Sequence, residues 1–236
     1  MAMTIINASE FSASNVNFSA LRVNKARGNK TVYLSGPNRS KLSIQFPWMR
    51  APFGLSSYTD AATNRTSYSL DLSFDKDKDD LMAIQAKFEE FDDLVVKTVA
   101  ANSKEWLGKP FKEAVLKEAL YKPVIRAGKD DYPSTMKLKV MVDNKTGDFV
   151  PEAYNMRKEN VPLSDLEKGM KVIVIAEIAS IWFIDNKFGV TVRLQQLLME
   201  PPNKLPKFAF TGIDTEETAE EEVEYEEVEV DDDEAQ

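Results

Sequence analysis

The stretch 171-KVIVIAEIASIWFIDNKFGVTVRLQQLLM-199 decides the fold. Two long apolar runs, rich in β-branched residues, flank Asp185 and Asn186, and this pair of residues suits a two-residue hairpin turn. The longest apolar stretch, residues 172–184, is interrupted by Glu177 and is too short to cross a bilayer as a helix. We therefore predict a hairpin of two long strands.

With Asp185 and Asn186 as the turn, the hairpin has two distinct faces. The apolar face, which belongs in the core, pairs Phe183 with Phe188, Ile181 with Val190 and Ala179 with Val192. The other face pairs Trp182 with Gly189, Ser180 with Thr191 and Ile178 with Arg193. A tryptophan over a glycine, with an arginine nearby, is a platform on which a nucleobase could stack while the arginine meets phosphate. The alternative is that Trp182 packs beneath an inserted helix.

Shorter strands are predicted on both sides of this hairpin. The period-two pattern indicates strands in TVYLS (31–35), KLSIQF (41–46), SYSLDLSF (67–74) and TMKLKVMV (135–142). Between them, apolar residues recur every three or four positions from Asp79 to Lys104, which predicts a long helix. A shorter helix is expected in 110-PFKEAVLKEAL-120, with Pro110 early in it. We expect a mainly β (α+β) protein, an OB-fold Greek-key barrel with a helical insert at about residues 77–120.

Charge divides the chain into two parts. Residues 214–236 hold fourteen carboxylates and no basic residue, which leaves 25 acidic and 30 basic residues in 1–213, a net charge of +5. Apolar content also falls beyond Gly212. We therefore expect a barrel domain over residues 1–212 and a disordered acidic tail over 213–236.

Composition makes an enzyme improbable. The chain has no cysteine and no histidine, which removes thiolate nucleophiles, the commonest general base and the commonest transition-metal ligand. The segment 75-DKDKDD-80 lacks the glycine and the closing glutamate of a calcium loop. No metal and no cofactor is expected. Because a basic leader followed by an apolar run is also missing at the N-terminus, we expect an intracellular protein without a membrane partner.

Two further stretches combine aromatic and basic residues. The loop in 45-QFPWMRAPFGLSSY-58 carries Trp48, Phe53, Tyr58 and Arg50, a mixture typical of sequence-tolerant single-strand binding. Its alternative role is to plug one end of the barrel. The segment 119–140 carries Tyr121, Lys122, Arg126, Lys129, Lys137 and Lys139, where the last two share a strand face. Surface lysines on a strand are also ordinary edge protection.

Four segments in order resemble a known family: PWMRAPFGL, PFKEAVLKEALYKPVIR, GKDDYPSTMKLKV and IWFIDNKFGVTVRLQQL, followed by an acidic tail. They are similar to the OB-fold single-stranded-DNA-binding proteins of nucleocytoplasmic large DNA viruses, which are related to the replicative single-strand binders of tailed phages. The resemblance covers residues 30–200 and the tail.

The resemblance implies a protein that coats exposed DNA during replication, recombination and repair, in the cytoplasm or nucleus of an infected cell. Phage members are typically dimers, so a homodimer is an expected state. Their acidic tails recruit polymerase or helicase and compete with DNA for the binding groove. Phage tails commonly end in an aromatic residue, whereas this chain ends DEAQ and Tyr225 is its only tail aromatic. A terminal aromatic hook is therefore not carried over.

We accordingly expect a non-enzymatic single-stranded-DNA-binding protein. The residues expected to stack on bases are Trp48, Phe53, Tyr58 and Trp182. The residues expected to contact phosphate are Arg50, Arg126, Lys137, Lys139, Lys187 and Arg193. The residues expected to bind partners are Glu220, Glu221, Glu222, Tyr225, Asp231, Asp232 and Asp233. The alternative is a virion or transcription-complex interaction protein that uses the barrel as a scaffold and the tail to bind basic proteins.

Overall fold

The long hairpin forms as predicted in the computed structural model of the chain. Strand β14 (Lys171–Ile184) pairs antiparallel with β15 (Lys187–Met199) over almost their whole lengths. Asp185 and Asn186 connect them with positive φ angles of 50° and 65°, the backbone that a tight two-residue turn requires. The structure describes residues 5–25 and 28–200, all within one compact unit. The predicted tail lies outside the described residues.

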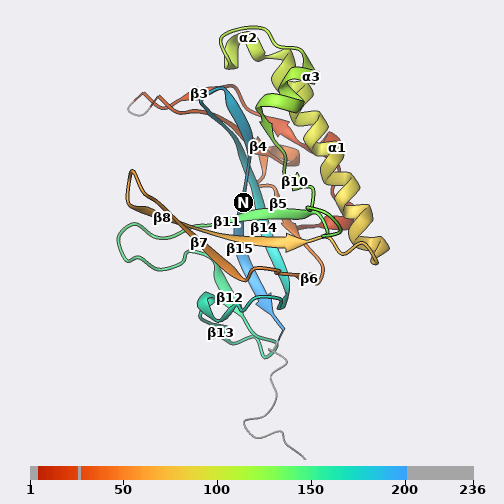
Figure 1. Cartoon of the computed structure of the whole chain (residues 1–236), viewed down its shortest axis with the longest axis vertical. Helices are drawn as coiled ribbons and strands as arrows, with labels where there is room; N and C mark the ends of the chain where they lie inside the picture. Colours follow the sequence, from red (N-terminus) through yellow and green to blue (C-terminus); the bar gives the residue numbers. More distant parts are fainter. Residues whose placement is uncertain (1–4, 26–27, 201–236) are drawn as a thin grey trace, which may run out of the picture. The chain divides into compact units, whose positions relative to one another are not determined.

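The other strands assemble around this hairpin (Figure 1). They are β1 (Ile5–Asn7), β2 (Asn17–Phe18), β3 (Arg22–Val23), β4 (Lys30–Ser35), β5 (Ser43–Gln45), β6 (Met49–Arg50), β7 (Leu55–Asp60), β8 (Arg65–Ser73), β9 (Tyr121–Lys122), β10 (Ile125–Arg126), β11 (Thr135–Val140), β12 (Glu152–Tyr154) and β13 (Asn160–Val161). All the strands predicted from the period-two pattern are among them.

A ring of pairings closes the sheet into a barrel. β14 pairs with β6, β6 with β8, β8 with β11, β11 with β15, and β15 returns to β14. The β11–β15 pairing is parallel and the other four are antiparallel, so the strands follow a Greek-key order rather than a simple up-and-down order. This mainly β architecture with a helical insert is an OB-like barrel.

The helices fall between β8 and β9, as expected. Helix α1 spans Asp79–Ala101, followed by α2 (Ser103–Trp106), α3 (Glu113–Val115) and the π-turn η4 (Leu116–Leu120). Single 3₁₀ turns occur elsewhere: η1 (Ala8–Glu10), η2 (Ala13–Asn15), η3 (Pro37–Arg39) and η5 (Leu163–Asp165). Two predicted helix boundaries differ from the structure. Helix α1 ends at Ala101, whereas the prediction extended it to Lys104. The second helix begins at Glu113, whereas the prediction began it at Pro110.

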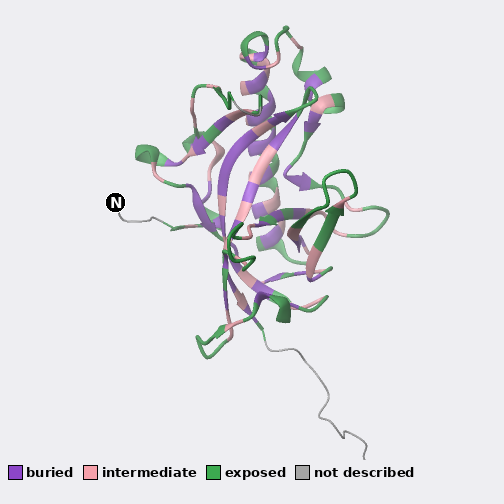
Figure 2. Ribbon diagram, turned by 90° about the vertical axis from the view of Figure 1, so that its left-hand side faces the viewer, coloured by how far each residue is buried: buried purple, intermediate pink, exposed green. Residues whose placement is uncertain are grey.

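Helix α1 buries the apolar stripe that its sequence predicts. Leu81, Ile84, Phe88, Phe91, Val95 and Val99 are all at most 3% exposed. The Phe88 ring stacks on Phe11 with centroids 4.7 Å apart and lies 5.4 Å from Phe46, so the helix joins the N-terminal segment to the barrel core. In Figure 2, which looks at the unit from the side opposite α1, the helix lies behind the strands.

The predicted register of the hairpin is correct near the turn and wrong farther away. Phe183–Phe188, Trp182–Gly189, Ile181–Val190 and Ser180–Thr191 pair as expected. A β-bulge then shifts the register between Ile178 and Ser180, so Ile178 pairs with Val192 and Glu177 pairs with Arg193. An inserted bulge residue, here Ala179, is what a strict period of two cannot anticipate.

A buried carboxylate fastens α1 to the strands that follow the insert. Asp92 is 7% exposed and accepts hydrogen bonds from the Tyr121 hydroxyl and from the backbone N–H groups of Val124 (3.0 Å) and Ile125 (3.2 Å). Burial raises the pKa of Asp92 to about 6 against these hydrogen bonds, which act to lower it. The contact holds the segment that contains β9 and β10.

Replacing Asp92 with asparagine tests this contact through its pH dependence. The native state holds the Asp92 proton more tightly than the unfolded chain, whose pKa is near 3.8. The stability from this group is therefore complete below about pH 4 and is lost as the pH rises through about 6, a change of about 3 kcal/mol. The free-energy gap between wild type and Asp92→Asn should widen as the pH falls from 7.5 to 4.5, measured by urea unfolding.

The neighbouring Asp93→Asn is the matched control, because Asp93 is exposed and pairs with Lys117 at the surface. This control should keep the wild-type pH dependence. A gap that stays constant with pH for Asp92→Asn would contradict the assignment.

Candidate nucleic-acid interface

One row of side chains crosses five neighbouring strands on the outer side of the sheet. Directly paired residues in a sheet point to the same face. The strand pairings connect Arg22, Thr31, Trp182, Gly189 and Lys122, in that order, from β3 through β4, β14 and β15 to β9. The row therefore places an aromatic ring between two cations.

Trp182 lies directly over Gly189. A Cβ atom built on Gly189 would meet Cζ2 of Trp182 at 2.8 Å, so only a glycine leaves room for the ring there. Trp182 is partly exposed. The inserted helical segment contacts the opposite face of the same strand instead, where Trp106 lies 6.0 Å from Phe183, centroid to centroid. The alternative that placed Trp182 beneath the helix does not fit this arrangement.

A second aromatic residue, Tyr33, lies beside this row. Ser180 pairs with Tyr33 on one side and with Thr191 on the other, which places Tyr33 on the same face as Trp182. Tyr33 is 47% exposed, and the Arg22 guanidinium lies 5.4 Å from the centre of its ring. Sequence reasoning missed both residues. The signal was available in 22-RVNKARGNK-30, where basic residues crowd in front of a strand.

A second row lies farther along the barrel and carries adjacent cations. Lys139 pairs with Ser69 on one side and with Arg193 on the other, and Ser69 pairs with Ser56. Two like charges on neighbouring strands destabilise a sheet unless an anion accompanies them. Among the described residues neither cation forms an ion pair, and Nε of Arg193 is buried without a hydrogen-bond partner. Glu177, which pairs with Arg193, instead accepts a hydrogen bond from Gln195.

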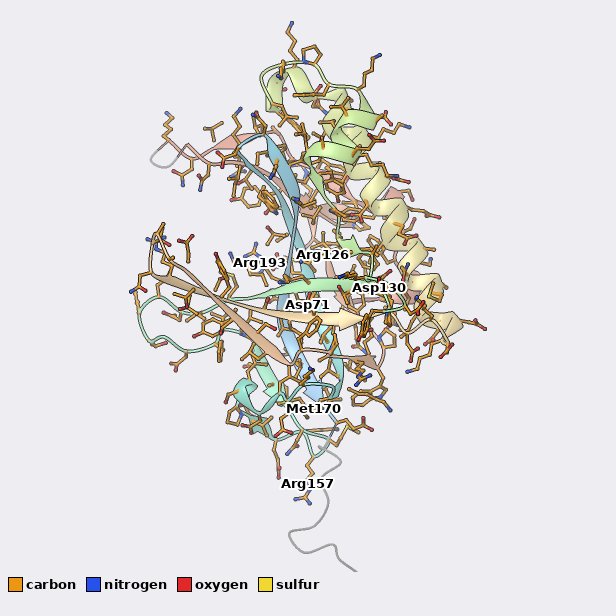
Figure 3. The ribbon with its side chains drawn as sticks, in the orientation of Figure 1. Asp71, Arg126, Asp130, Arg157, Met170 and Arg193 are labelled. Atoms are coloured by element: carbon orange, nitrogen blue, oxygen red, sulfur yellow. The ribbon has the colours of Figure 1, made fainter. Side chains whose placement is uncertain are left out.

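Lys137 and Arg126 extend this basic surface, and a buried acid, Asp71, lies beside Lys137 on the neighbouring strand. Lys137 pairs with Asp71 across β11 and β8, with the ammonium 3.8 Å from the carboxylate. Burial raises the pKa of Asp71, while the positive charges of Lys137 and Arg126 act to lower it. Figure 3 shows Asp71, Arg126 and Arg193 grouped around the crossing of β8, β11 and β14.

Tyr58 and Lys187 belong to the same outer face. Tyr58 pairs with Ser67 on β8, two residues before Ser69, and is 69% exposed. Lys187 is the first residue of β15, two positions before Gly189, and is exposed. The structure thus brings together Tyr58, Arg126, Lys137, Lys139, Trp182, Lys187 and Arg193 from the predicted set.

The aromatic stretch before β7 was predicted as a loop, but it contains the short strand β6. Arg50 of β6 pairs with Ser73 of β8, two residues after Asp71, so Arg50 lies on the outer face. The backbone of residues 51–54 packs on residues 166–170: Ala51 N–H donates to the Met170 carbonyl, and a Cβ on Gly54 would meet the Leu166 carbonyl at 2.9 Å. Figure 3 shows Met170 well away from Arg193. Arg50 is exposed beside Gly169, Phe53 is 58% exposed and Trp48 is partly exposed. The predicted tail residues, Glu220 to Asp233, fall outside the described part of the chain.

No helix within residues 5–25 and 28–200 is both long and apolar enough to span a membrane. That same part of the chain holds no cluster of three or more acidic or other metal-ligating side chains suited to a metal ion.

The described fold is similar to two solved phage proteins. The single-stranded DNA-binding protein gp2.5 of bacteriophage T7 is 15% identical, with a TM-score of 0.45 over 73% of this chain and 92% of that protein. The single-stranded DNA-binding protein of bacteriophage Enc34, solved in complex with single-stranded DNA, is 11% identical, with a TM-score of 0.39 over 77% of this chain and 95% of its own.

Sequence comparison gives a family but no curated relative. No curated protein matches the chain closely enough to count as one. A model described as a family of unknown function, DUF5871, matches residues 68–211, which is more than half of the chain. The match begins in β8 and runs through β11, β14 and β15, the strands that carry Lys137, Lys139, Trp182 and Arg193. The chain therefore belongs to the DUF5871 family.

Proposed function

We propose that the protein binds single-stranded DNA without sequence preference and coats it during viral DNA replication. The observation that carries this proposal is the outer face of the barrel, where Trp182 lies over Gly189 in a row flanked by Arg22 and Lys122. Every base offers a π-face to a stacked ring and every nucleotide carries a phosphate, so such a face binds strands of any sequence.

The cations beside the aromatic row support the same proposal. Lys139 and Arg193 are adjacent and neither forms an ion pair among the described residues, so an incoming phosphate relieves their mutual repulsion. Along β15, Gly189 and Arg193 are four residues apart, or about 13 Å. One strand can therefore stack on Trp182 and place a phosphate at Arg193.

Trp48, Arg50 and Phe53 are proposed to extend this contact. Arg50 shares the outer face through its pairing with Ser73, while Trp48 and Phe53 flank β6 and would meet a strand that continues around the barrel. The scaffold alternative predicts scattered charge, and the cations that β3, β9, β11 and β15 place on one outer face favour DNA over it.

Replacing Trp182 with leucine tests the stacking role. Loss of one stacked base should weaken binding to oligo-dT by about 1–3 kcal/mol and reduce the tryptophan quenching expected on binding. Tyr154→Leu is the matched control, because Tyr154 is also partly exposed but pairs with Leu198 at the far end of β15. Wild-type quenching in Trp182→Leu would rule out stacking at this position.

Replacing Arg193 with glutamine tests the phosphate contact. The slope of log Kd against log salt should become shallower by about 0.7, the value for one lost contact to a single strand. Arg157→Gln carries the same change in charge on an exposed arginine that lies far from Arg193 in Figure 3, and should leave the slope unchanged. Equal slopes for the two variants would show that Arg193 does not meet phosphate.

The acidic segment is proposed to compete with DNA and to bind replisome proteins such as polymerase or helicase. A chain that ends at Gly212 loses fourteen carboxylates. It should bind oligo-dT more tightly than the full chain at low salt and about equally at high salt, because salt screens the competing charges. Parallel titrations with oligo-U measure the preference between DNA and RNA. Equal affinity of both chains for oligo-dT at low salt would refute competition and leave only partner recruitment.

A further inference from the structure

Asp71 is a buried carboxylate on the proposed DNA-binding face of the barrel. Its neighbours along β8, Leu70 and Leu72, point into the core and are fully buried, so Asp71 points to the outer side. The Asp71 side chain is only 9% exposed, whereas that of Lys137 is 40% exposed. The carboxylate is thus the deeper member of the pair.

Within the described part of the chain, no hydrogen bond compensates the burial of Asp71. Among the described residues no group donates to its carboxylate, and the Lys137 ammonium at 3.8 Å is beyond hydrogen-bonding distance. Asp92 provides a direct contrast, because it is equally buried but accepts from three donors. A buried carboxylate that accepts no hydrogen bond lowers the stability of the folded state. Stability alone therefore does not explain an aspartate at this position.

The surroundings of Asp71 give it a different use. Lys137 and Arg126 both act electrostatically on its carboxylate, and Lys139 with Arg193 lies one step farther along the same face. Without Asp71, Glu177 would be the one carboxylate among the described residues that is paired in register with any of these cations, and Glu177 lies opposite Arg193 and accepts a hydrogen bond from Gln195. The carboxylate therefore holds the charge that a phosphate group would supply, while Lys137 stays close enough to the surface to reach a ligand.

We propose that Asp71 is an internal counter-ion that competes with the DNA backbone for Lys137, so that Lys137 exchanges Asp71 for phosphate when a strand binds. This inference rests on the proposed function and adds that the barrel itself limits the affinity for DNA. Because Asp71 competes with one phosphate for Lys137 in every bound molecule, the protein dissociates from DNA more readily than it would without Asp71.

Asp71→Asn tests the proposal and keeps the shape of the side chain. Removing the competitor should tighten binding to oligo-dT about three- to tenfold at low salt. The log–log salt slope should steepen by up to about 0.7 as Lys137 becomes fully available. Asp130→Asn is the control, because it makes the same change in charge at an exposed residue in the turn between β10 and β11. Unchanged or weaker binding by Asp71→Asn overturns the proposal.

A double-mutant cycle with Lys137→Gln tests the exchange itself. If Lys137 must leave Asp71 to bind, Lys137→Gln should cost more affinity in the Asp71→Asn background than in wild type. Equal costs in the two backgrounds overturn the exchange. Thermal unfolding of all four proteins identifies any loss of affinity that follows from loss of fold.

Inorganic polyphosphate separates this inference from the proposed function. If wild type does not bind oligo-dT but Asp71→Asn binds polyphosphate more tightly than wild type, the exchange stands and the DNA proposal fails. If oligo-dT binds and Asp71→Asn tightens neither ligand, the DNA proposal stands and the exchange fails.

Discussion

The rest of the structure depends on the antiparallel pairing of β14 with β15. Strands β4, β5 and β6 pair with β14, while β9, β11 and β12 pair with β15. The tight turn at Asp185 and Asn186 sets the register of this pairing, and the register decides which side chains face outward. Both proposed rows of binding residues are consequences of it, because Trp182, Gly189 and Arg193 all lie in this hairpin.

The hairpin could be predicted from sequence up to its bulge and no farther. The turn residues and two apolar runs were enough for Trp182 to be matched with Gly189. Beyond Ser180 the shift at Ala179 changes the partner of Arg193 from Ile178 to Glu177. The physical reason is that Ala179, Ser180 and Ile181 are all buried, so the strand gives no alternation from which a register could be read. Helix α1 was predictable because its apolar stripe, from Leu81 to Val99, repeats over about five turns.

Prediction of the candidate site was limited by contacts between distant residues. Strands β3, β9 and β10 have two residues each, too few for any periodicity, yet they supply Arg22, Lys122 and Arg126. Tyr33 joins Trp182 only because β4 pairs with β14, nearly 150 residues later in the chain. The loop with Trp48 and Phe53 had the expected composition, but its packing on residues 166–170 directs it away from Arg193. Local composition identifies residues suited to nucleic acid, and only the pairing of strands decides which of them share a face.

The two buried aspartates show how the structure separates a structural carboxylate from a functional one. Burial raises the pKa of both, so the direction of the shift does not distinguish them. Their hydrogen bonds do. Asp92 joins a helix to a strand segment and has three donors, which is what a group retained for stability requires. Asp71 has none among the described residues and lies beside cations on an outward face. A protein that only needed a stable barrel would gain by an apolar residue there, so the free energy spent on Asp71 is best understood as a cost of controlling what binds to that face.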